Sequence, residues 1–398
     1  MRIPRRRAHA VVGLVLLVGA CGGEDEGELR FGPPLPALAR DLTIGLEEED
    51  PHEFEQIEDI EVDSDGNMYI LDGRARRIAV FDREGRLRIA FGREGEGPGE
   101  FVWPHQLAWI GEDLAVVDRG AVRISVFHRS GALRDTWTDP LWQSVVELSS
   151  VGDDLLAVEQ RARREPFESR RYDAVYVNLV RLPGEIVDTV ATWVDSSVVQ
   201  VRYRALAARF GGPGLTQVRA PYGPRGVWDS RGPEILHGFG NEYRIHRFVV
   251  SDGRAHRAGD VSHDFPTPHL SAAERDSIRK TIADLDERFD LDPRMPIPIP
   301  RQRPTFDRMV LSGDGTRVWL RTFRHGDPRL QMWDVHDCDL AYLGSVSLPR
   351  EMWVYAVAGH ALYTAGWTSL DIPYVARYRV PADLASPAEG CPTRGRDP

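Results

Sequence analysis

The sequence predicts an all-β repeat protein, and two observations carry this prediction. Seven residues between positions 72 and 87 return 46 positions later, as Asp72 does at Asp118. Short apolar runs such as 68–71 and 78–81 alternate with Asp-Gly and Glu-Gly turns. Runs of this length between such turns are typical of a four-stranded antiparallel meander. Repetition at this period indicates a solenoid or a propeller rather than an ordinary globular domain.

The N-terminal segment has the pattern of a bacterial lipoprotein signal. Four arginines within the first seven residues precede an apolar run, 10–20, that is too short for a stable transmembrane helix. The run ends in Val-Gly-Ala-Cys at 18–21, which resembles a lipobox. We therefore expect residues 1–20 to be a signal peptide and Cys21 to carry a lipid anchor; an ordinary secretory signal is the alternative. Gly22 in place of an aspartate favours the outer membrane, facing the periplasm or the cell surface.

Residues 21–40 are expected to form the acylated N-terminus and a flexible tether, because their Gly, Glu, Asp and Pro content cannot bury a core. A short strand is expected at 42–44. In a closed ring of sheets, such a strand can complete the last sheet and leave no open edge. The folded domain is expected at 41–384, with a C-terminal tail at 385–398.

Six copies of the repeat can be counted. After the two clear copies, apolar runs of strand length recur in degenerate form within 145–193, 235–248, 309–334 and 354–380. Residues 66–109, which begin GNMYILDGRARRIAVFD and end VWPHQLAW, resemble the NHL-type repeat of six-bladed β-propellers, and in particular a bacterial family rich in lipoproteins. The resemblance is specific over 56–139 and implies six blades of four antiparallel strands in a protein of the cell envelope.

The same resemblance implies that two Asp–Arg pairs, Asp72 with Arg77 and Asp118 with Arg123, are structural. The spacing agrees independently, because in each pair one residue ends the second strand of a blade and the other opens the third, across one turn. We expect these pairs to hold their blades together.

Loop lengths indicate a working face. In such a blade, the first-to-second and third-to-fourth turns lie on one face, and the remaining connections lie on the other. Every long segment belongs to the second set: 92–104, 159–174, 196–224, 265–304 and 366–373. We call this end of the ring the long-loop face, and we expect ligands there because a rigid scaffold can position long loops. The alternative is that insertions accumulate there without a function.

The segment 265–304 predicts a helical insertion between blades four and five. Ser271 and Glu274 have the spacing of a capping box. One apolar stripe of a helix follows, formed by Ile278, Ile282, Leu285 and Phe289. A proline-rich return then leads back to the ring. We expect this helix to pack on its own propeller as a lid or rim, with partner binding as the alternative.

Polar residues are expected at the mouth of the central channel, on the innermost strands. They are Glu58, Asp59, His105, Gln106, Glu147, Asp307 and Arg308. Carboxylates of this kind could hold Ca²⁺, since hard cations prefer oxygen ligands; the alternative is a polar channel lining. Gluconolactonase-type propellers use a comparable central site, but their ligand pattern is not found here.

An arginine-rich loop in blade three is a second candidate site. It contains Arg161, Arg163, Arg164, Arg170 and Arg171. In a chain of formal net charge −11, this local positive patch could bind carboxylates, sulfates or phosphates. The alternative is a solvated loop, because arginine is common here and Lys280 is the only lysine. The negative net charge argues against nucleic acid, and no HExxH or Gly-x-Ser-x-Gly motif indicates a zinc or serine hydrolase.

Two cysteines remain once Cys21 is assigned to the lipid. Aligning Asp334 with Asp82 places Cys338 at the turn between the third and fourth strands of blade five, and Cys391 lies in the tail. In an oxidising compartment we expect a Cys338–Cys391 disulfide.

Three functions are therefore open. The first is a lipid-anchored binding or scaffolding module that engages a protein, peptide or glycan through the long-loop face. The second is a metal-assisted lactonase or esterase with a central-channel site, and the third is a structural envelope component. Apart from Ca²⁺ in the channel, no cofactor is expected.

Overall fold

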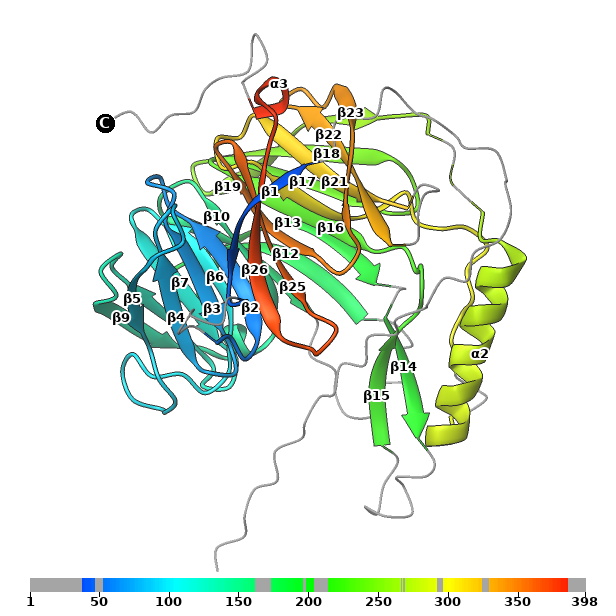
Figure 1. Cartoon of the computed structure of the whole chain (residues 1–398), viewed down its shortest axis with the longest axis horizontal. Helices are drawn as coiled ribbons and strands as arrows, with labels where there is room; N and C mark the ends of the chain where they lie inside the picture. The colour runs from blue at the N-terminus through cyan, green and yellow to red at the C-terminus, as the bar shows by residue number, and fades with distance from the viewer. Residues whose placement is uncertain are drawn as a thin grey trace, which may run out of the picture.

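The computed structural model is a six-bladed β-propeller with four antiparallel strands in each blade (Figure 1). The residues that it describes are 38–46, 53–161, 173–195, 198–203, 214–265, 267, 269–291, 296–323 and 329–385. The predicted fold class is confirmed, including the helix between blades four and five.

The strands of each blade follow one another along the chain. Blade 1 contains β2 (Ile57–Val62), β3 (Met68–Asp72), β4 (Arg77–Phe81) and β5 (Leu87–Phe91), and blade 2 contains β6 (Pro104–Ile110), β7 (Asp113–Asp118), β8 (Arg123–Phe127) and β9 (Leu133–Thr138). Blade 3 contains β10 (Val145–Val151), β11 (Leu155–Arg161), β12 (Asp173–Arg181) and β13 (Glu185–Asp195), and blade 4 contains β16 (Gly226–Arg231), β17 (Glu234–Phe239), β18 (Arg244–Ser251) and β19 (Arg254–Ser262). Blade 5 contains β20 (Phe306–Leu311), β21 (Arg317–Thr322), β22 (Leu330–Asp337) and β23 (Tyr342–Pro349).

Blade 6 joins the two ends of the folded chain. It contains β24 (Trp353–Ala358), β25 (Ala361–Trp367), β26 (Pro373–Arg379) and, as its outermost strand, β1 (Ala39–Ile44). The predicted closing strand is therefore present and is longer than 42–44. It also contacts blade 1, because Leu42 packs against Gly85. A side chain at Gly85 would clash with Leu42, and the φ of +82° at this position also favours glycine.

The innermost strands form a closed circle. Each of β2, β6, β10, β16, β20 and β24 contacts the next, and β24 contacts β2. Six apolar clusters fill the spaces between neighbouring blades. The core is thus a ring of interfaces, and a side chain on an innermost strand points either into one of these interfaces or toward the central axis.

Two insertions depart from the repeat. The helix α2 (Ala272–Phe289) begins at the predicted capping box, in which the Ser271 Oγ accepts from the Glu274 N–H at 3.2 Å and the Ser271 N–H donates to the Glu274 carboxylate at 2.9 Å. Ile278 and Leu285 of its apolar stripe are buried. In Figure 1, α2 lies at the edge of the molecule and overlaps none of the blades in that view.

The second insertion lies in the predicted long loop 196–224, in which no strands were predicted. It contains a two-stranded hairpin, β14 (Val198–Tyr203) with β15 (Gly214–Arg219). Short helical turns also occur at Pro140–Gln143 and Ala382–Ala385. In the described part of the chain, no helix is long and apolar enough to span a membrane.

The turn that carries Cys338 begins at Asp337, and not at Asp334. Asp337 accepts from the backbone of Asp339 and Ala341, as Asp82 does from Glu84 and Arg86 in blade 1. The predicted match of Asp334 with Asp82 was therefore three residues out of register. Cys338 is disulfide-bonded. Cys21 and Cys391 both lie outside the described residues, so the pairing with Cys391 stays a prediction.

Candidate functional site

The seven residues predicted at the channel mouth lie within the first three positions of innermost strands, at the long-loop end. Glu58 and Asp59 belong to β2, His105 and Gln106 to β6, Glu147 to β10, and Asp307 and Arg308 to β20. All seven are half-buried. His105 Nδ1 lies 3.5 Å from a Glu58 oxygen, whereas Asp307 is held by Arg321 of β21 and by Arg225, which precedes β16.

Asp307 is the anchor of an arginine cluster. Arg321 donates to both of its carboxylate oxygens at 2.7 Å, and Arg225 approaches it at 3.5 Å while also donating to its backbone carbonyl at 2.7 Å. Burial alone would raise the pKa of Asp307, but Arg321 and Arg225 outweigh burial and hold this pKa below its usual value. Asp307 is therefore an ionised group that positions two guanidinium groups.

Arg308 extends the cluster toward blades 3 and 6. Its guanidinium lies over the Trp353 ring, 4.2 Å from the centroid, and Arg321 approaches the same ring at 5.3 Å. Burial lowers the pKa of Arg308, and the neighbouring Arg321 lowers it further, while Glu147 opposes both effects. The aromatic face offsets part of the cost of placing this cation away from bulk water.

Two glutamates face each other on blade 3. Glu147 of β10 pairs in register with Glu159 of β11, and the Trp228 Nε1 of blade 4 donates to Glu159 at 2.8 Å. Burial, together with the Glu159 charge, raises the pKa of Glu147 to about 8. Burial also raises the pKa of Glu159, against the Trp228 hydrogen bond and Arg161. Both carboxyls therefore stay protonated to a higher pH than a free glutamate does.

Arginines from blade 3 and from the hairpin complete the group. Arg161, at the end of β11, contacts Asp195, at the end of β13, at 3.2 Å. Arg219, at the end of β15, is close enough to Arg225, Arg161 and Asp307 to interact with them electrostatically. Burial and these two arginines lower the pKa of Arg219 to about 10.

We call these nine ionisable residues the channel-mouth cluster. Its members are Glu147, Glu159, Arg161, Asp195, Arg219, Arg225, Asp307, Arg308 and Arg321. Five are guanidinium groups and four are carboxyls, and burial raises the pKa of two of these carboxyls, Glu147 and Glu159. Strand polarity places seven of them toward the long-loop face, and Arg219 and Arg225 belong to the segment between blades 3 and 4, which lies on the same face. Guanidinium groups bind planar and tetrahedral oxyanions through paired hydrogen bonds, so the cluster has the chemistry of an anion site.

Carboxyls on the innermost strands of blades 1 and 4 bond to neighbouring blades. Asp59 accepts from the Leu107 N–H of blade 2, and Asp229 accepts from the Leu311 N–H of blade 5, both at 2.8 Å. Burial raises the pKa of Asp59 to about 6 and the pKa of Glu61 to about 8, the latter against the effect of Arg231. Asp59 and Asp229 thus tie neighbouring blades together near the axis.

Sequence reasoning missed most of the channel-mouth cluster. Glu159 and Arg321 occupy the blade position that is Leu71 in blade 1 and Val117 in blade 2, since all four pair with the third residue of an innermost strand. A charged residue at a normally apolar repeat position is a signal that a complete alignment of the blades would have exposed. Arg219 and Arg225 lie in the insertion between blades 3 and 4, where no repeat register exists.

The predicted blade pairs are within ion-pair distance, at 3.8 Å for Asp72 with Arg77 and 3.9 Å for Asp118 with Arg123. Each aspartate is fully buried and also accepts backbone N–H groups: Asp118 accepts from Val102, Trp103, Gly120 and Ala121 at 2.8–3.1 Å. Their larger contribution is to fix the chain where one blade passes to the next.

The other candidate sites receive less support. Of the predicted anion patch, Arg161 belongs to the channel-mouth cluster, while Arg163, Arg164, Arg170 and Arg171 lie outside the described residues. Among the described residues, no three His, Cys, Asp or Glu side chains are arranged to hold a metal ion. The Ca²⁺ site stays a prediction without a ligand set in that part of the chain.

Comparison with known proteins agrees with this architecture. Residues 42–146 match a family model described as a 6-bladed beta-propeller. No curated protein matches the chain. The chain is thus a six-bladed β-propeller, of a kind found in bacterial proteins.

Solved structures show the same fold at low sequence identity. A Bacteroides fragilis protein described as exported is 10% identical, with 86% of this chain and 95% of that chain covered and a TM-score of 0.50. Virginiamycin B lyase from Staphylococcus aureus is 11% identical, with 83% and 97% covered and a TM-score of 0.40. The calcium-binding protein regucalcin from Agrobacterium tumefaciens is 10% identical, with 88% and 98% covered and a TM-score of 0.40. At these identities the likeness concerns the fold alone.

Proposed function

We propose that this protein is a lipid-anchored binding module of the cell envelope that holds an anionic group of a peptide, protein or glycan at the channel mouth. The observation that supports the proposal is the channel-mouth cluster, in which guanidinium groups from blades 3 and 5 and from the segment between blades 3 and 4 converge. Cations held close together and away from bulk water are destabilised by desolvation and mutual repulsion. A bound anion reduces that cost.

The composition of the cluster supports binding over a purely structural role. A structural ion pair needs one cation for each anion, as in Asp72 with Arg77. Here Arg225 and Arg321 share the single carboxylate of Asp307, and Arg308 rests on an aromatic ring beside Glu147, whose pKa is raised to about 8. The Trp353 ring adds a flat apolar surface for the remainder of a ligand.

Calorimetric titration of the full chain tests this proposal. Citrate, glutarate, inorganic phosphate and sulfate serve as probes, and binding to at least one of them is expected. Arg308→Gln should weaken that binding about tenfold or more, the usual effect of losing a charge-assisted hydrogen bond. Arg88→Gln, which removes an exposed arginine on β5, is the matched control and should leave binding unchanged. Lack of binding to every probe, or equal weakening by both variants, would contradict the proposal.

Anchoring is tested separately. Cys21→Ser should move the protein from the membrane fraction to the soluble fraction, because the lipid is the proposed means of attachment. If the variant still sediments with membranes and the wild type incorporates no labelled palmitate, the anchoring proposal is wrong.

A hydrolytic activity is the second candidate, and the glutamate pair favours it. Glu147 and Glu159 face each other and both have a raised pKa, so the pair can hold a proton near neutral pH for general acid–base catalysis. A panel of lactones and esters tests this candidate: turnover that Glu147→Gln abolishes would support it, and the absence of turnover would dismiss it.

A further inference from the structure

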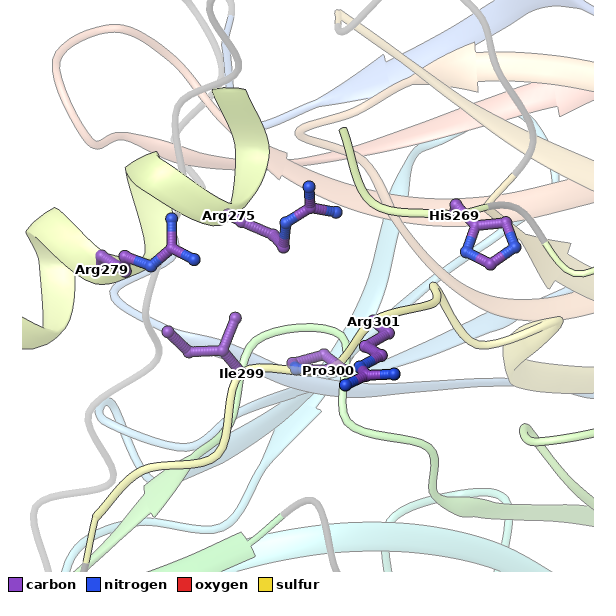
Figure 2. A pocket seen from close by; sticks show the side chains of 6 residues that line it. All are labelled: His269, Arg275, Arg279, Ile299, Pro300 and Arg301. Atoms are coloured by element: carbon purple, nitrogen blue, oxygen red, sulfur yellow. The ribbon is translucent and has the colours of Figure 1, made fainter. Parts of the chain in front are cut away.

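A separate hollow of roughly 370 Å³ lies between α2 and the chain that returns from it (Figure 2). Its lining is unusual for an acidic protein, because it contains three arginines and a histidine but no carboxylate. The lining residues are His269, Arg275, Arg279, Ile299, Pro300 and Arg301. In Figure 2, Arg275 and Arg279 come from the helix, while His269 and Arg301 lie at the opposite end of the hollow.

The walls of this hollow are held in place by their own contacts. The capping box fixes the first turn of α2, and the Leu270 N–H donates to the Arg301 carbonyl at 3.0 Å, which joins the two segments that flank the hollow. Arg303 contacts Glu274 at 2.5 Å and the Phe323 carbonyl at 3.3 Å, which ties the start of α2 to blade 5. Leu270, Ile278 and Ile297 are buried beneath. The hollow is therefore built by ordered segments.

The arginine positions oppose helix stability. Arg275 and Arg279 are one turn apart, so their like charges repel each other. Arg275 lies at the end of the first turn of α2, where the helix dipole disfavours cations. Arg279 contacts the exposed Asp276, and Arg275 donates to the Leu270 carbonyl, which does not neutralise its charge. Arg301, from the returning chain, adds a third cation to the same hollow.

We propose that this hollow, which we call the α2 pocket, is a second binding site, specific for a phosphate or sulfate group. A tetrahedral dianion can accept paired hydrogen bonds from guanidinium groups on opposite walls and thereby remove their mutual repulsion. Ile299 and Pro300 provide an apolar wall for the carbon skeleton that carries the group. The site is distinct from the channel-mouth cluster, and its existence does not depend on that cluster binding a ligand.

Isothermal titration with inorganic phosphate, inorganic sulfate and phenyl phosphate tests this inference. The full chain carrying Arg308→Gln is used throughout, so that binding at the channel mouth is suppressed. Phenyl phosphate should bind more tightly than inorganic phosphate, because its ring contacts the apolar wall. Arg279→Gln and Arg301→Gln should each weaken binding about tenfold or more.

The chain offers a closely matched control. Lys280 follows Arg279 on the same helix and is exposed, but it does not line the pocket. Lys280→Gln therefore removes the same charge from the same turn and should change the affinity less than twofold. Equal weakening by Lys280→Gln and Arg279→Gln would show nonspecific attraction and overturn the inference, as would the absence of binding at millimolar concentrations. Arg301 lies outside the helix. If Arg301→Gln and Arg279→Gln both weaken binding, unfolding of α2 is not the cause.

Discussion

Carboxyl groups removed from solvent have two different roles in this propeller. Their hydrogen-bond partners distinguish the two roles. Asp118 is fully buried and accepts four backbone N–H groups, which gives it a structural role. Glu147 is half-buried on an innermost strand, and no backbone N–H is among the chief influences on its pKa. The first kind of carboxyl holds the chain, and the second is available to respond to pH or to a ligand.

We expect Asp118→Ala to lower the free energy of unfolding by roughly 1–3 kcal/mol, because the backbone donors lose a buried acceptor. Asp72→Ala should behave in the same way. Asp135→Ala, on the exposed face of β9, is the control and should have little effect. Chemical denaturation measures all three. Unchanged stability combined with lost ligand affinity would instead assign Asp118 to binding.

The raised pKa of Glu147 predicts how stability depends on pH. Its folded-state pKa of about 8 lies above the 4.5 of a free glutamate, so its stabilising contribution is complete below about pH 4.5 and is lost as the pH rises through 8. The melting temperature should therefore fall between pH 5 and pH 9, and it should fall less in Glu147→Gln. The charged neighbours Glu159, Asp229, Arg225 and Arg308 are present in both proteins. Parallel melting curves against pH would contradict this assignment.

At the scale of elements, those marked by a pattern of residues close together in the sequence could be predicted. An element without such a pattern could not. The blades were predicted because each is a meander of neighbouring strands whose turns and apolar runs are adjacent in sequence. The capping box placed the start of α2 for the same reason. The hairpin of β14 and β15 was missed because the repeat does not extend across the insertion that contains it.

The candidate site illustrates the limit more sharply. Glu147 and Arg308 were predicted because the repeat aligns innermost strands, but their partners Glu159 and Arg321 lie on second strands of degenerate blades. Arg219 reaches the same place from a hairpin whose path only a structure shows. Aligning the repeats identifies positions that are equivalent in every blade. The candidate site instead uses residues that are found in one blade and not in the others.

The capping box makes α2 separately testable. Ser271→Ala should destabilise the helix by about 0.5–2 kcal/mol, because the Glu274 N–H loses its side-chain acceptor. Hydrogen exchange of the amides in α2 should accelerate, while exchange in the blades stays the same. Ser277→Ala, in the body of the helix, is the control. Faster exchange throughout the propeller would show that α2 is not an independent unit.

At the scale of the whole molecule, ring closure depends on β1. Asp41 contacts Arg377 of β26 at 3.0 Å, and Arg377 also donates to the Arg83 carbonyl of blade 1. Ile44 is buried in the apolar cluster between blades 6 and 1. A strand from the start of the folded chain therefore bonds the last blade and helps to join it to the first.

Ile44→Ala should cost about 2–5 kcal/mol of unfolding free energy, the usual range for such a truncation in a core. Leu46→Ala is the control, because Leu46 is two residues away but exposed. Thermal unfolding measures both. A small effect of Ile44→Ala would mean that the ring is stable without a well-packed closing strand.

The pairing of β1 with β26 also imposes an order on biosynthesis. Blades 1 to 5 can each form as soon as their own four strands have been made, since their contacts are local. Blade 6 joins residues as far apart as 340 positions, Ala39 and Arg379, so the strand made first must wait for the strand made last. A chain that stops before β26 keeps β1 without its partner strand and leaves a sheet edge open to aggregation and proteolysis. The closing strand thus makes a stable ring conditional on synthesis of the folded chain through β26.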